Sequence, residues 1–178
     1  ASGMGAILTM CLAYLKAGDH LLCAKQLFGS SVALFDTYFQ EFGITVNYVD
    51  CFDNLAWQNA ILPNTKVLYC ESPSNPLAQI ADLTFLAKLA HDNGALLIVD
   101  NCFATPAIQK PLELGADVVI HSASKYIDGQ GRVLGGALVG NDTLMEKAFG
   151  VVRTGGISLS PFNAWVLLKG LETLSLRM

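Results

Sequence analysis

Charged residues are scarce in this 178-residue sequence: Asp, Glu, Lys and Arg together make up 15% of it, and the formal net charge is -4. This balance leaves no basic stripe of the kind that binds nucleic acid. No apolar run is long enough to cross a membrane, because charges such as Lys16, Asp19 and Lys25 interrupt each candidate. The first residues also lack the basic stretch and apolar core of a secretory signal. We therefore expect a cytoplasmic protein that binds neither nucleic acid nor a membrane.

Paired cysteines are also missing. The five cysteines form no Cys-x-x-Cys pair and show no zinc-binding spacing with histidine. An odd number of cysteines favours free thiols over a disulfide framework. Cys23, Cys70 and Cys102 lie in or beside apolar runs, where cysteine commonly serves as a small hydrophobic residue. We expect reduced thiols with no catalytic role, and no metal site.

Hydrophobic residues, by contrast, make up 52% of the chain. A parallel sheet covered on both faces, or a surface reserved for other subunits, would explain this fraction. Strand patterns occur at 20–24, 45–49, 66–70, 95–99, 118–121 and 136–139, and helix patterns at 3–16, 31–42, 55–61, 83–93, 142–151 and 162–178. This alternation predicts an α/β fold with a mostly parallel, doubly wound sheet and helices on both of its faces. No linker or internal repeat divides the chain.

Both ends of the chain look interrupted. Ser2 already reads as the cap of a first helix, and the last residues stop inside a helical pattern without a terminating signal. We expect a piece of a longer protein; a naturally short chain with frayed ends is the alternative.

Two predicted strands end in residues that carry chemistry. The apolar run at 116–120 leads into His121-Ser122-Ala123-Ser124-Lys125-Tyr126, and the run at 94–99 ends in Asp100. Open α/β sheets bind ligands at this carboxyl edge. A lysine that can form a Schiff base and an aspartate that keeps a pyridine nitrogen protonated are the two anchors of pyridoxal 5'-phosphate. We therefore predict this cofactor, with Lys125 and Asp100 as the catalytic pair; an isolated strand-end Asp or Lys could instead be a solvated cap or an ion pair.

Small residues could bind the phosphate of such a cofactor. Ser2-Gly3-Met4-Gly5 opens a helix, where free backbone N–H groups and the helix dipole favour an anion. The hydroxyl groups of Ser122 and Ser124 could complete the phosphate site, although ordinary turn chemistry also explains these serines. Asn75, in the segment Glu71-Ser72-Pro73-Ser74-Asn75-Pro76 after another strand, could hold a fixed hydrogen-bonding position between two prolines; a rigid surface turn is the alternative.

Taken in order, these segments resemble the cystathionine γ-synthase-like enzymes, the Cys/Met-metabolism family of pyridoxal phosphate enzymes. The segments that carry the resemblance are Ser2-Gly3-Met4, Phe28-Gly29-Ser30, residues 71–76, Val99-Asp100-Asn101, residues 122–126 and Leu159-Ser160-Pro161-Phe162. Residues 125–132 and Asn101-Cys102-Phe103 look like the versions found in the O-succinylhomoserine sulfhydrylase subgroup.

The resemblance implies a fold-type I, aminotransferase-like large domain and a homotetramer built from tight dimers. It assigns cofactor-binding roles to Gly3, Met4, Phe28, Asn75, Asp100, Ser122, Ser124 and Lys125. Gly3 and Met4 would bind the phosphate through backbone N–H groups, and Asn75 would lie near the phenolic oxygen. Phe28 stands where most relatives have a tyrosine on the cofactor ring, so stacking is kept and the hydroxyl is lost. The family's N-terminal arm and smaller C-terminal domain are not in these 178 residues, so the whole chain, 1–178, would be the central cofactor-binding domain.

The resemblance further implies γ-replacement: O-succinylhomoserine, or another O-acylhomoserine, reacts with sulfide to give homocysteine for methionine biosynthesis. The same chemistry with cysteine, as in a cystathionine γ-synthase, and γ-elimination by a methionine or cystathionine lyase are alternatives that these motifs do not separate. A truncated oligomerisation or binding module is a non-enzymatic alternative.

Overall fold

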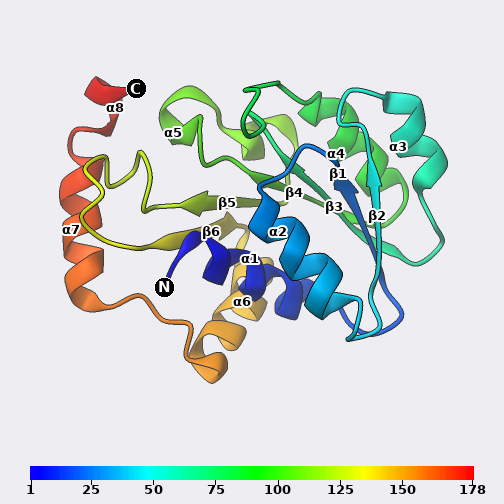
Figure 1. Cartoon of the computed structure of the whole chain (residues 1–178), viewed down its shortest axis with the longest axis horizontal. Helices are drawn as coiled ribbons and strands as arrows, with labels where there is room; N and C mark the ends of the chain where they lie inside the picture. The colour runs from blue at the N-terminus through cyan, green and yellow to red at the C-terminus, as the bar shows by residue number, and fades with distance from the viewer.

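The computed structural model describes residues 1–178 and contains a six-stranded sheet with the order β2-β1-β3-β4-β5-β6 (Figure 1). The strands are β1 (His20–Ala24), β2 (Thr45–Val49), β3 (Thr65–Glu71), β4 (Leu96–Asp100), β5 (Val118–Ser122) and β6 (Gly136–Gly140). Strands β1 to β5 pair in parallel, and β6 pairs antiparallel with β5. The chain moves outward from β1 to β2 and then returns past β1 to β3, so the sheet is wound in both directions. The predicted mostly parallel α/β sheet is confirmed.

Eight α-helices accompany this sheet, and most of them cover its two faces. They are α1 (Gly3–Tyr14), α2 (Gly29–Leu34), α3 (Asn54–Ala60), α4 (Leu83–Asp92), α5 (Thr105–Ile108), α6 (Asp142–Gly155), α7 (Pro161–Leu171) and α8 (Leu174–Arg177). A π-helical turn (Phe35–Phe39) continues α2, and a 3-10 turn (Pro111–Leu114) precedes β5. In Figure 1, α1, α2 and α6 lie on one side of the sheet, and α3, α4 and α5 lie on the other. No helix combines the length and the hydrophobicity that crossing a membrane requires.

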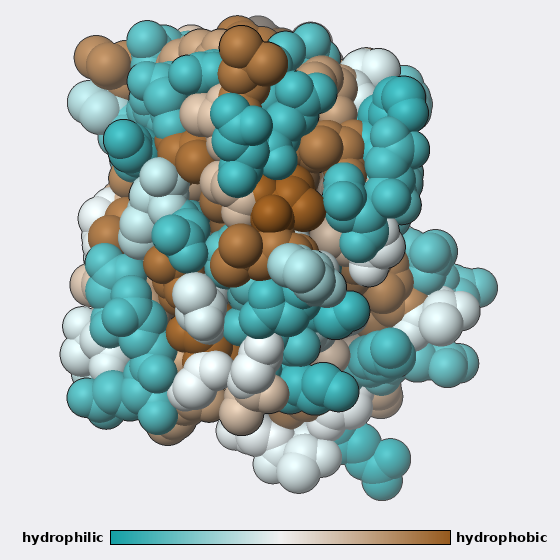
Figure 2. Space-filling view, turned by 90° about the vertical axis from the view of Figure 1, so that its right-hand side faces the viewer, coloured by the Kyte–Doolittle hydropathy of each residue, from teal (hydrophilic) through white to brown (hydrophobic).

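The core lies around the central strands because parallel strands are covered on both faces. Every residue of β1 is buried, and Trp57, Tyr69 and Phe35 are among the largest fully buried side chains. Strand β2 forms one edge of the sheet, and its first four residues are exposed or half-buried. Figure 2 views the side on which β2 and α3 lie, where hydrophobic side chains are interrupted by hydrophilic ones.

Local signals explain where most helices begin and end. The Asp82 side chain accepts a hydrogen bond from the Phe85 N–H, as the N-cap of α4. Gly94 follows that helix with φ at 66°, a left-handed conformation that favours glycine.

Three helical segments depart from the prediction. The continuous helix expected at 162–178 is two helices, because residues 172 and 173 form a turn, in which the Thr173 N–H donates to the Gly170 carbonyl, and α8 begins only at Leu174. Helix α5 and the following 3-10 turn were not predicted. Each is four residues long, which is too short to show helical periodicity in the sequence.

Candidate active site

One cavity of about 230 Å³ lies at the carboxyl ends of the central strands, lined by 14 residues. All eight residues predicted to bind the cofactor lie in its lining: Gly3, Met4, Phe28, Asn75, Asp100, Ser122, Ser124 and Lys125. They come from the start of α1, the start of α2, the last residues of β4 and β5, and the segments that follow β3 and β5. The sheet therefore brings together residues that are more than 100 positions apart in the sequence.

The start of α1 supplies unpaired donors to this cavity. The Ser2 hydroxyl accepts the Gly5 N–H at 3.0 Å, and the Ser2 carbonyl accepts the Ala6 N–H at 2.9 Å. The N–H groups of Gly3 and Met4 donate no hydrogen bond within the chain. An anion at this helix end would therefore find free donors and a favourable dipole.

Close packing holds α1 against the end of β5. A Cβ atom added at Gly3 would lie 2.7 Å from the Ser122 Cβ, so this approach requires glycine. The Ser122 N–H donates to the Cys102 Sγ at 2.7 Å, and the Ser122 hydroxyl forms no hydrogen bond within the chain. The Ser124 hydroxyl accepts the Gly135 N–H at 2.9 Å and lies 3.3 Å from the Gly135 carbonyl oxygen. Ser124 is thus tied to the segment before β6, whereas Ser122 is available to a ligand.

Asp100 is the buried carboxyl group of the cavity, with 6% of its surface exposed. Its Oδ1 accepts the Cys102 N–H at 3.1 Å, and its Oδ2 accepts the Tyr69 hydroxyl at 3.4 Å. Burial raises the pKa of Asp100, and hydrogen bonds from Cys102 and Tyr69 and the charge of Lys125 oppose that rise. A cation placed against Asp100 would favour its ionised form still more strongly.

Glu71 is a second buried carboxyl group in the same cavity. It ends β3 and is the register partner of Asp100 on β4. Its Oε2 accepts the backbone N–H of Phe28 at 2.8 Å, which fixes the start of α2. Burial, and then the nearby Asp100, raise the pKa of Glu71 to about 7, against the opposing effects of the Phe28 N–H and Lys125. Two neighbouring carboxyl groups make this cavity attractive to a cation.

Lys125 carries the amine at the mouth of the cavity. Its side chain is exposed, and its Nζ lies 5.4 Å from the centroid of the Phe28 ring. The exposed fraction of Phe28 is 40%, so a planar group could lie against its open face. The Lys125 amine forms no ion pair within the chain and is free to react.

Asn75 lies in the loop between β3 and α4. The loop is held by its own serines: the Ser72 hydroxyl accepts the Ala81 N–H at 3.1 Å, and the Ser74 hydroxyl accepts the Gln79 N–H at 3.2 Å. The side chain of Asn75 has no hydrogen-bond partner and lines the cavity. The loop thus presents a free amide to a ligand.

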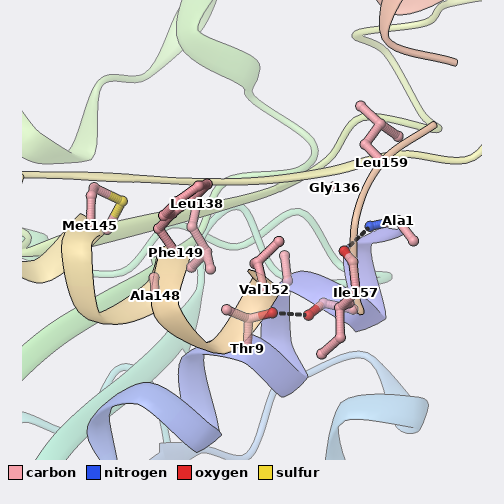
Figure 3. A pocket seen from close by; sticks show the side chains of 12 residues that line it. Ala1, Thr9, Gly136, Leu138, Met145, Ala148, Phe149, Val152, Ile157 and Leu159 are labelled. Atoms are coloured by element: carbon pink, nitrogen blue, oxygen red, sulfur yellow. Dashed lines mark hydrogen bonds between the residues drawn. The ribbon is translucent and has the colours of Figure 1, made fainter. Parts of the chain in front are cut away.

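A larger cavity, of about 360 Å³, lies between α1, α6 and β6 (Figure 3). Nine of its 12 lining residues are hydrophobic, and no ionisable side chain lines it. Its polar contacts are the bond from the Ala1 amino group to the Ile157 carbonyl and that from Thr9 to Gly5. This cavity therefore offers an apolar surface for packing and no side chain suited to acid–base or nucleophilic catalysis.

Sequence reasoning assigned no role to three residues around Asp100. Glu71 was quoted in its motif, but its position as the strand-end neighbour of Asp100 was the signal that could have identified it. Cys102 was read as a small hydrophobic residue, yet it lines the cavity and bonds to both Ser122 and Asp100. Tyr69, inside a buried strand, carries no sequence signal that separates it from an ordinary core aromatic.

The whole chain, residues 1–178, matches the family described as Cys/Met metabolism PLP-dependent enzyme. The chain belongs to this family. It is 57% identical over 178 residues to O-succinylhomoserine sulfhydrylase of Pseudomonas aeruginosa, a match that covers 100% of the chain and 44% of that protein. It is 45% identical over 179 residues to the cystathionine gamma-synthase/O-acetylhomoserine (thiol)-lyase of Bacillus subtilis, covering 100% and 48%. It is also 42% identical over 180 residues to L-methionine gamma-lyase of Pseudomonas putida, covering 100% and 45%.

The fold is that of solved structures of this family. The crystal structure of cystathionine gamma-lyase from Lactobacillus plantarum complexed with L-serine superposes with a TM-score of 0.97 at 42% identity, covering 100% of the chain and 47% of that protein. The fold-type I, pyridoxal phosphate-dependent class is therefore confirmed. The chain spans a little under half the length of these relatives.

The cavity suits pyridoxal phosphate, the cofactor of this family. Free N–H groups at Gly3 and Met4 and the Ser122 hydroxyl match a phosphate, and buried Asp100 matches a protonated ring nitrogen. The Lys125 amine matches an aldehyde, and Phe28 offers a flat apolar surface. No lining residue contradicts this fit.

Proposed function

We propose that the protein carrying this chain catalyses γ-replacement, in which an O-acylhomoserine reacts with sulfide to form homocysteine. O-Succinylhomoserine is the proposed substrate, because 57% identity links the chain to an O-succinylhomoserine sulfhydrylase over its full length. The observation that carries the proposal is the meeting of Lys125, Asp100 and the free N–H groups of α1 in one cavity. This reaction would serve methionine biosynthesis in the cytoplasm.

The chain's residues divide the work of holding the cofactor. Gly3, Met4 and the serines 122 and 124 would hold the phosphate, although Ser124 would first have to share its hydroxyl with Gly135. Asp100 would bind the protonated ring nitrogen, and Asn75 would donate toward the phenolic oxygen. Phe28 would stack on the ring. When bound, pyridoxal phosphate supplies an electron sink for charge that develops on the substrate Cα.

Lys125 would be both the covalent anchor of the cofactor aldehyde and the proton carrier of the reaction. After the amino group of the substrate displaces it, its amine would accept the Cα proton and return protons as the γ-acyloxy group leaves and sulfide adds. Phe28 lacks a hydroxyl group, so Lys125 would carry out this work without a tyrosine at that position.

The chain is further proposed to be the central cofactor-binding domain of a longer, homotetrameric enzyme. The relatives are about twice as long as the chain, which supports this proposal. The substrate-binding residues outside these 178 positions would then decide between replacement and elimination.

Product analysis on the complete protein tests the reaction. Incubation of O-succinylhomoserine with sulfide, with cysteine, or with neither should give homocysteine only in the first case. Cystathionine from cysteine would instead identify the synthase that we name as the alternative, and a ketoacid formed without any added thiol would identify a lyase.

Borohydride trapping tests the site itself. The wild-type protein with pyridoxal phosphate should give a reduced adduct on the peptide that contains Lys125, and Lys125→Ala should lose both the adduct and turnover. Lys169→Ala, which removes an exposed amine of α7, should change neither. Turnover by Lys125→Ala at the wild-type rate would overturn the assignment, and a cofactor-free stable monomer would favour a non-catalytic module.

A further inference from the structure

Lys125 is followed by a loop that contains no helix or strand, residues 126–132. The backbone N–H of Lys125 donates to the Ser122 carbonyl at 3.2 Å, and its carbonyl accepts the Gly129 N–H at 2.8 Å. Its side chain is exposed, and its amine forms no ion pair; the centroid of the Phe28 ring lies 5.4 Å from the Nζ. The position of Lys125 therefore depends on whatever holds this loop.

Asp128 holds the loop from within. Its side chain is fully buried, and its Oδ2 accepts the N–H groups of Gln130 at 3.2 Å and Arg132 at 2.7 Å. Its Oδ1 pairs with the Arg132 Nε at 2.9 Å. The Arg132 Nη2 then donates to the Val166 carbonyl on α7 at 3.4 Å, which joins the loop to that helix.

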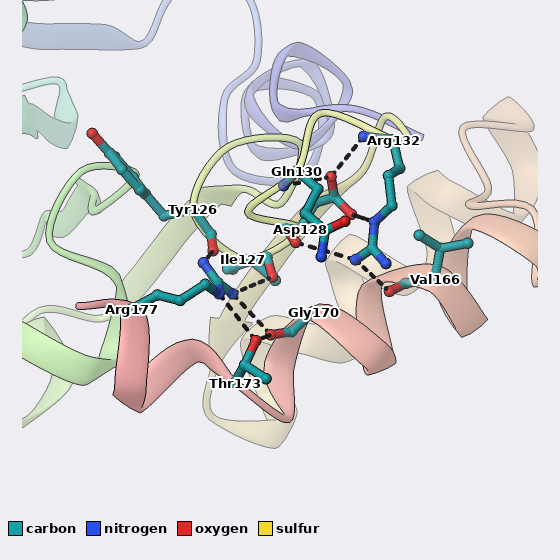
Figure 4. Close-up of polar contacts among 9 residues, drawn as sticks. All are labelled: Tyr126, Ile127, Asp128, Gln130, Arg132, Val166, Gly170, Thr173 and Arg177. Atoms are coloured by element: carbon teal, nitrogen blue, oxygen red, sulfur yellow. Dashed lines mark hydrogen bonds and ion pairs between the residues drawn. The ribbon is translucent and has the colours of Figure 1, made fainter.

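Arg177, from α8, holds the loop from outside (Figure 4). Its Nη1 donates to the Tyr126 carbonyl at 2.6 Å, and its Nη2 donates to the carbonyls of Ile127 at 3.3 Å and Gly170 at 2.8 Å. Its Nε donates to the Thr173 hydroxyl at 3.0 Å. All three nitrogens of one guanidinium are therefore engaged, and two of their partners are the residues directly after Lys125.

Two glycines permit this close approach. Gly129 has φ at 76°, and a Cβ atom there would collide with the Arg177 guanidinium. A Cβ atom at Gly170 would lie 2.9 Å from the Asp128 Cα and closer still to the Ile127 carbonyl. Helix α7 and Arg177 thus approach the loop as closely as glycine allows.

We propose that Arg177 is a positioning residue for Lys125. Its guanidinium group donates hydrogen bonds to the carbonyls of Tyr126 and Ile127. These bonds set the direction of the backbone directly after Lys125. Lysine cannot replace Arg177, because an ammonium group is a point donor and cannot span both carbonyls and Thr173. The inference rests on the proposed function to the extent that Lys125 is taken as the cofactor-binding amine.

The first measurement is amide hydrogen exchange in the cofactor-free protein. It reports how often the backbone hydrogen bonds of the loop open, whether or not the cofactor can bind. Arg177→Lys and Arg177→Met should accelerate exchange at residues 128–132 about tenfold, since charge-assisted hydrogen bonds are lost, with little change in β1 or β4. Arg153→Met removes an exposed arginine of α6 that forms no hydrogen bond and should leave the loop unchanged. Loop exchange at the wild-type rate in both Arg177 variants would overturn the proposal.

Substitutions at two glycines of the loop test the same contact while Arg177 itself is kept. Gly129→Ala should displace the guanidinium, whereas Gly131→Ala introduces a side chain at a similar positive φ, 65°, with nothing within 4 Å of its Cβ. Both substitutions strain the backbone to a similar degree, so only the contact with Arg177 differs. Faster loop exchange in Gly129→Ala than in Gly131→Ala is expected, and equal exchange in the two would contradict the proposal.

The second measurement follows Lys125 itself. With pyridoxal phosphate present, the rate at which Lys125 forms its borohydride-fixable adduct should fall between about 10-fold and 100-fold in the Arg177 variants, as expected for a misplaced reacting group. The pH midpoint of the bound cofactor's absorbance should also shift, which a loss of global stability alone would not cause. Unchanged rate and midpoint would overturn the positioning role. If the wild-type protein formed no adduct, the proposed function would fail, while the exchange data would still decide whether Arg177 holds the loop.

Discussion

The paired carboxyl groups of Glu71 and Asp100 are the main electrostatic feature of the cavity at the scale of single residues. They end neighbouring strands in register, both are nearly buried, and the pKa of each is raised chiefly by burial. Like charges on neighbouring residues of this kind oppose each other's ionisation, and Asp100 contributes to the raised pKa of Glu71. A cation bound at Asp100 would relieve that repulsion, so we expect the cofactor-free protein to be less stable at high pH than its packing alone would suggest.

Glu71→Gln should therefore stabilise the cofactor-free protein at pH 8. The folded-state pKa of Glu71 is raised from 4.5 to about 7, so the folded state holds this proton more tightly than the unfolded state. The stability that the protonated group provides is complete below about pH 4.5 and is lost as pH rises to about 7. Glutamine avoids this loss and still accepts the Phe28 N–H, so we expect a gain of up to about 3 kcal/mol at pH 8 and a smaller gain at pH 5.

Urea unfolding of wild type and variant at the two pH values measures this difference. Glu113→Gln, at an exposed carboxylate paired with Lys110, should show little effect at either pH. An equal effect of Glu71→Gln at pH 5 and pH 8 would mean that ionisation of Glu71 is not the cause.

Sequence reasoning could identify the residues whose chemistry is rare, and not those whose role depends on a neighbour. A lysine and an aspartate at the ends of apolar strands predict a cofactor site from position alone. Tyr69 bonds to Asp100 only because β3 and β4 lie side by side. The hydrogen bonds from the Arg177 guanidinium likewise form only because α8 folds back over a loop some 50 positions earlier in the chain. Such a contact leaves no pattern in the local sequence.

At the scale of whole elements, the start of α1 packs directly against the end of β5. Gly3→Ala should weaken the binding of pyridoxal phosphate at least about tenfold, because its Cβ would push the free N–H groups of α1 away from Ser122. Gly29→Ala at the start of α2 is the matched control, since nothing lies within 4 Å of its Cβ. It should keep the affinity and add about 0.5–1 kcal/mol of stability by restricting the unfolded chain.

Titration of cofactor absorbance gives the two affinities, and urea unfolding gives the two stabilities. Equal affinities in Gly3→Ala and Gly29→Ala would show that the α1–β5 contact does not shape the phosphate site.

The elements themselves were predictable where burial and length supplied a strong signal. Strands β1 and β2 have the bounds that their apolar patterns predicted; β5 and β6 differ by one residue at one end, and β3 and β4 by one residue at each end. Helices α1, α4 and α6 begin where predicted and end within four residues of the predicted ends. The break between α7 and α8 was missed because no proline or strong terminating signal stands within residues 162–178. In the structure Gly170 packs against the backbone of Ile127 and Asp128, and its carbonyl accepts a hydrogen bond from Arg177.

At the scale of the molecule, the cavity joins segments that are far apart in the chain. Its lining runs from Ser2 to Leu134 and includes the ends of β3, β4 and β5. A ligand there contacts elements that can come together only in the folded state. Occupancy of the site must therefore be linked to global unfolding and not only to the local order of one loop.

Pyridoxal phosphate at 100 times its dissociation constant should raise the free energy of unfolding by about 2.7 kcal/mol. Urea unfolding at two cofactor concentrations measures this gain. Pyridoxal, which lacks the phosphate, and pyridoxine phosphate, which lacks the aldehyde, separate the two halves of the site. At equal concentration each should stabilise the protein less than pyridoxal phosphate does, since one cannot use the α1 N–H groups and the other cannot react with Lys125. Equal stabilisation by pyridoxal would mean that the N–H groups at the start of α1 do not contribute to cofactor binding. Equal stabilisation by pyridoxine phosphate would mean that the exposed Lys125 amine adds nothing to binding in this chain.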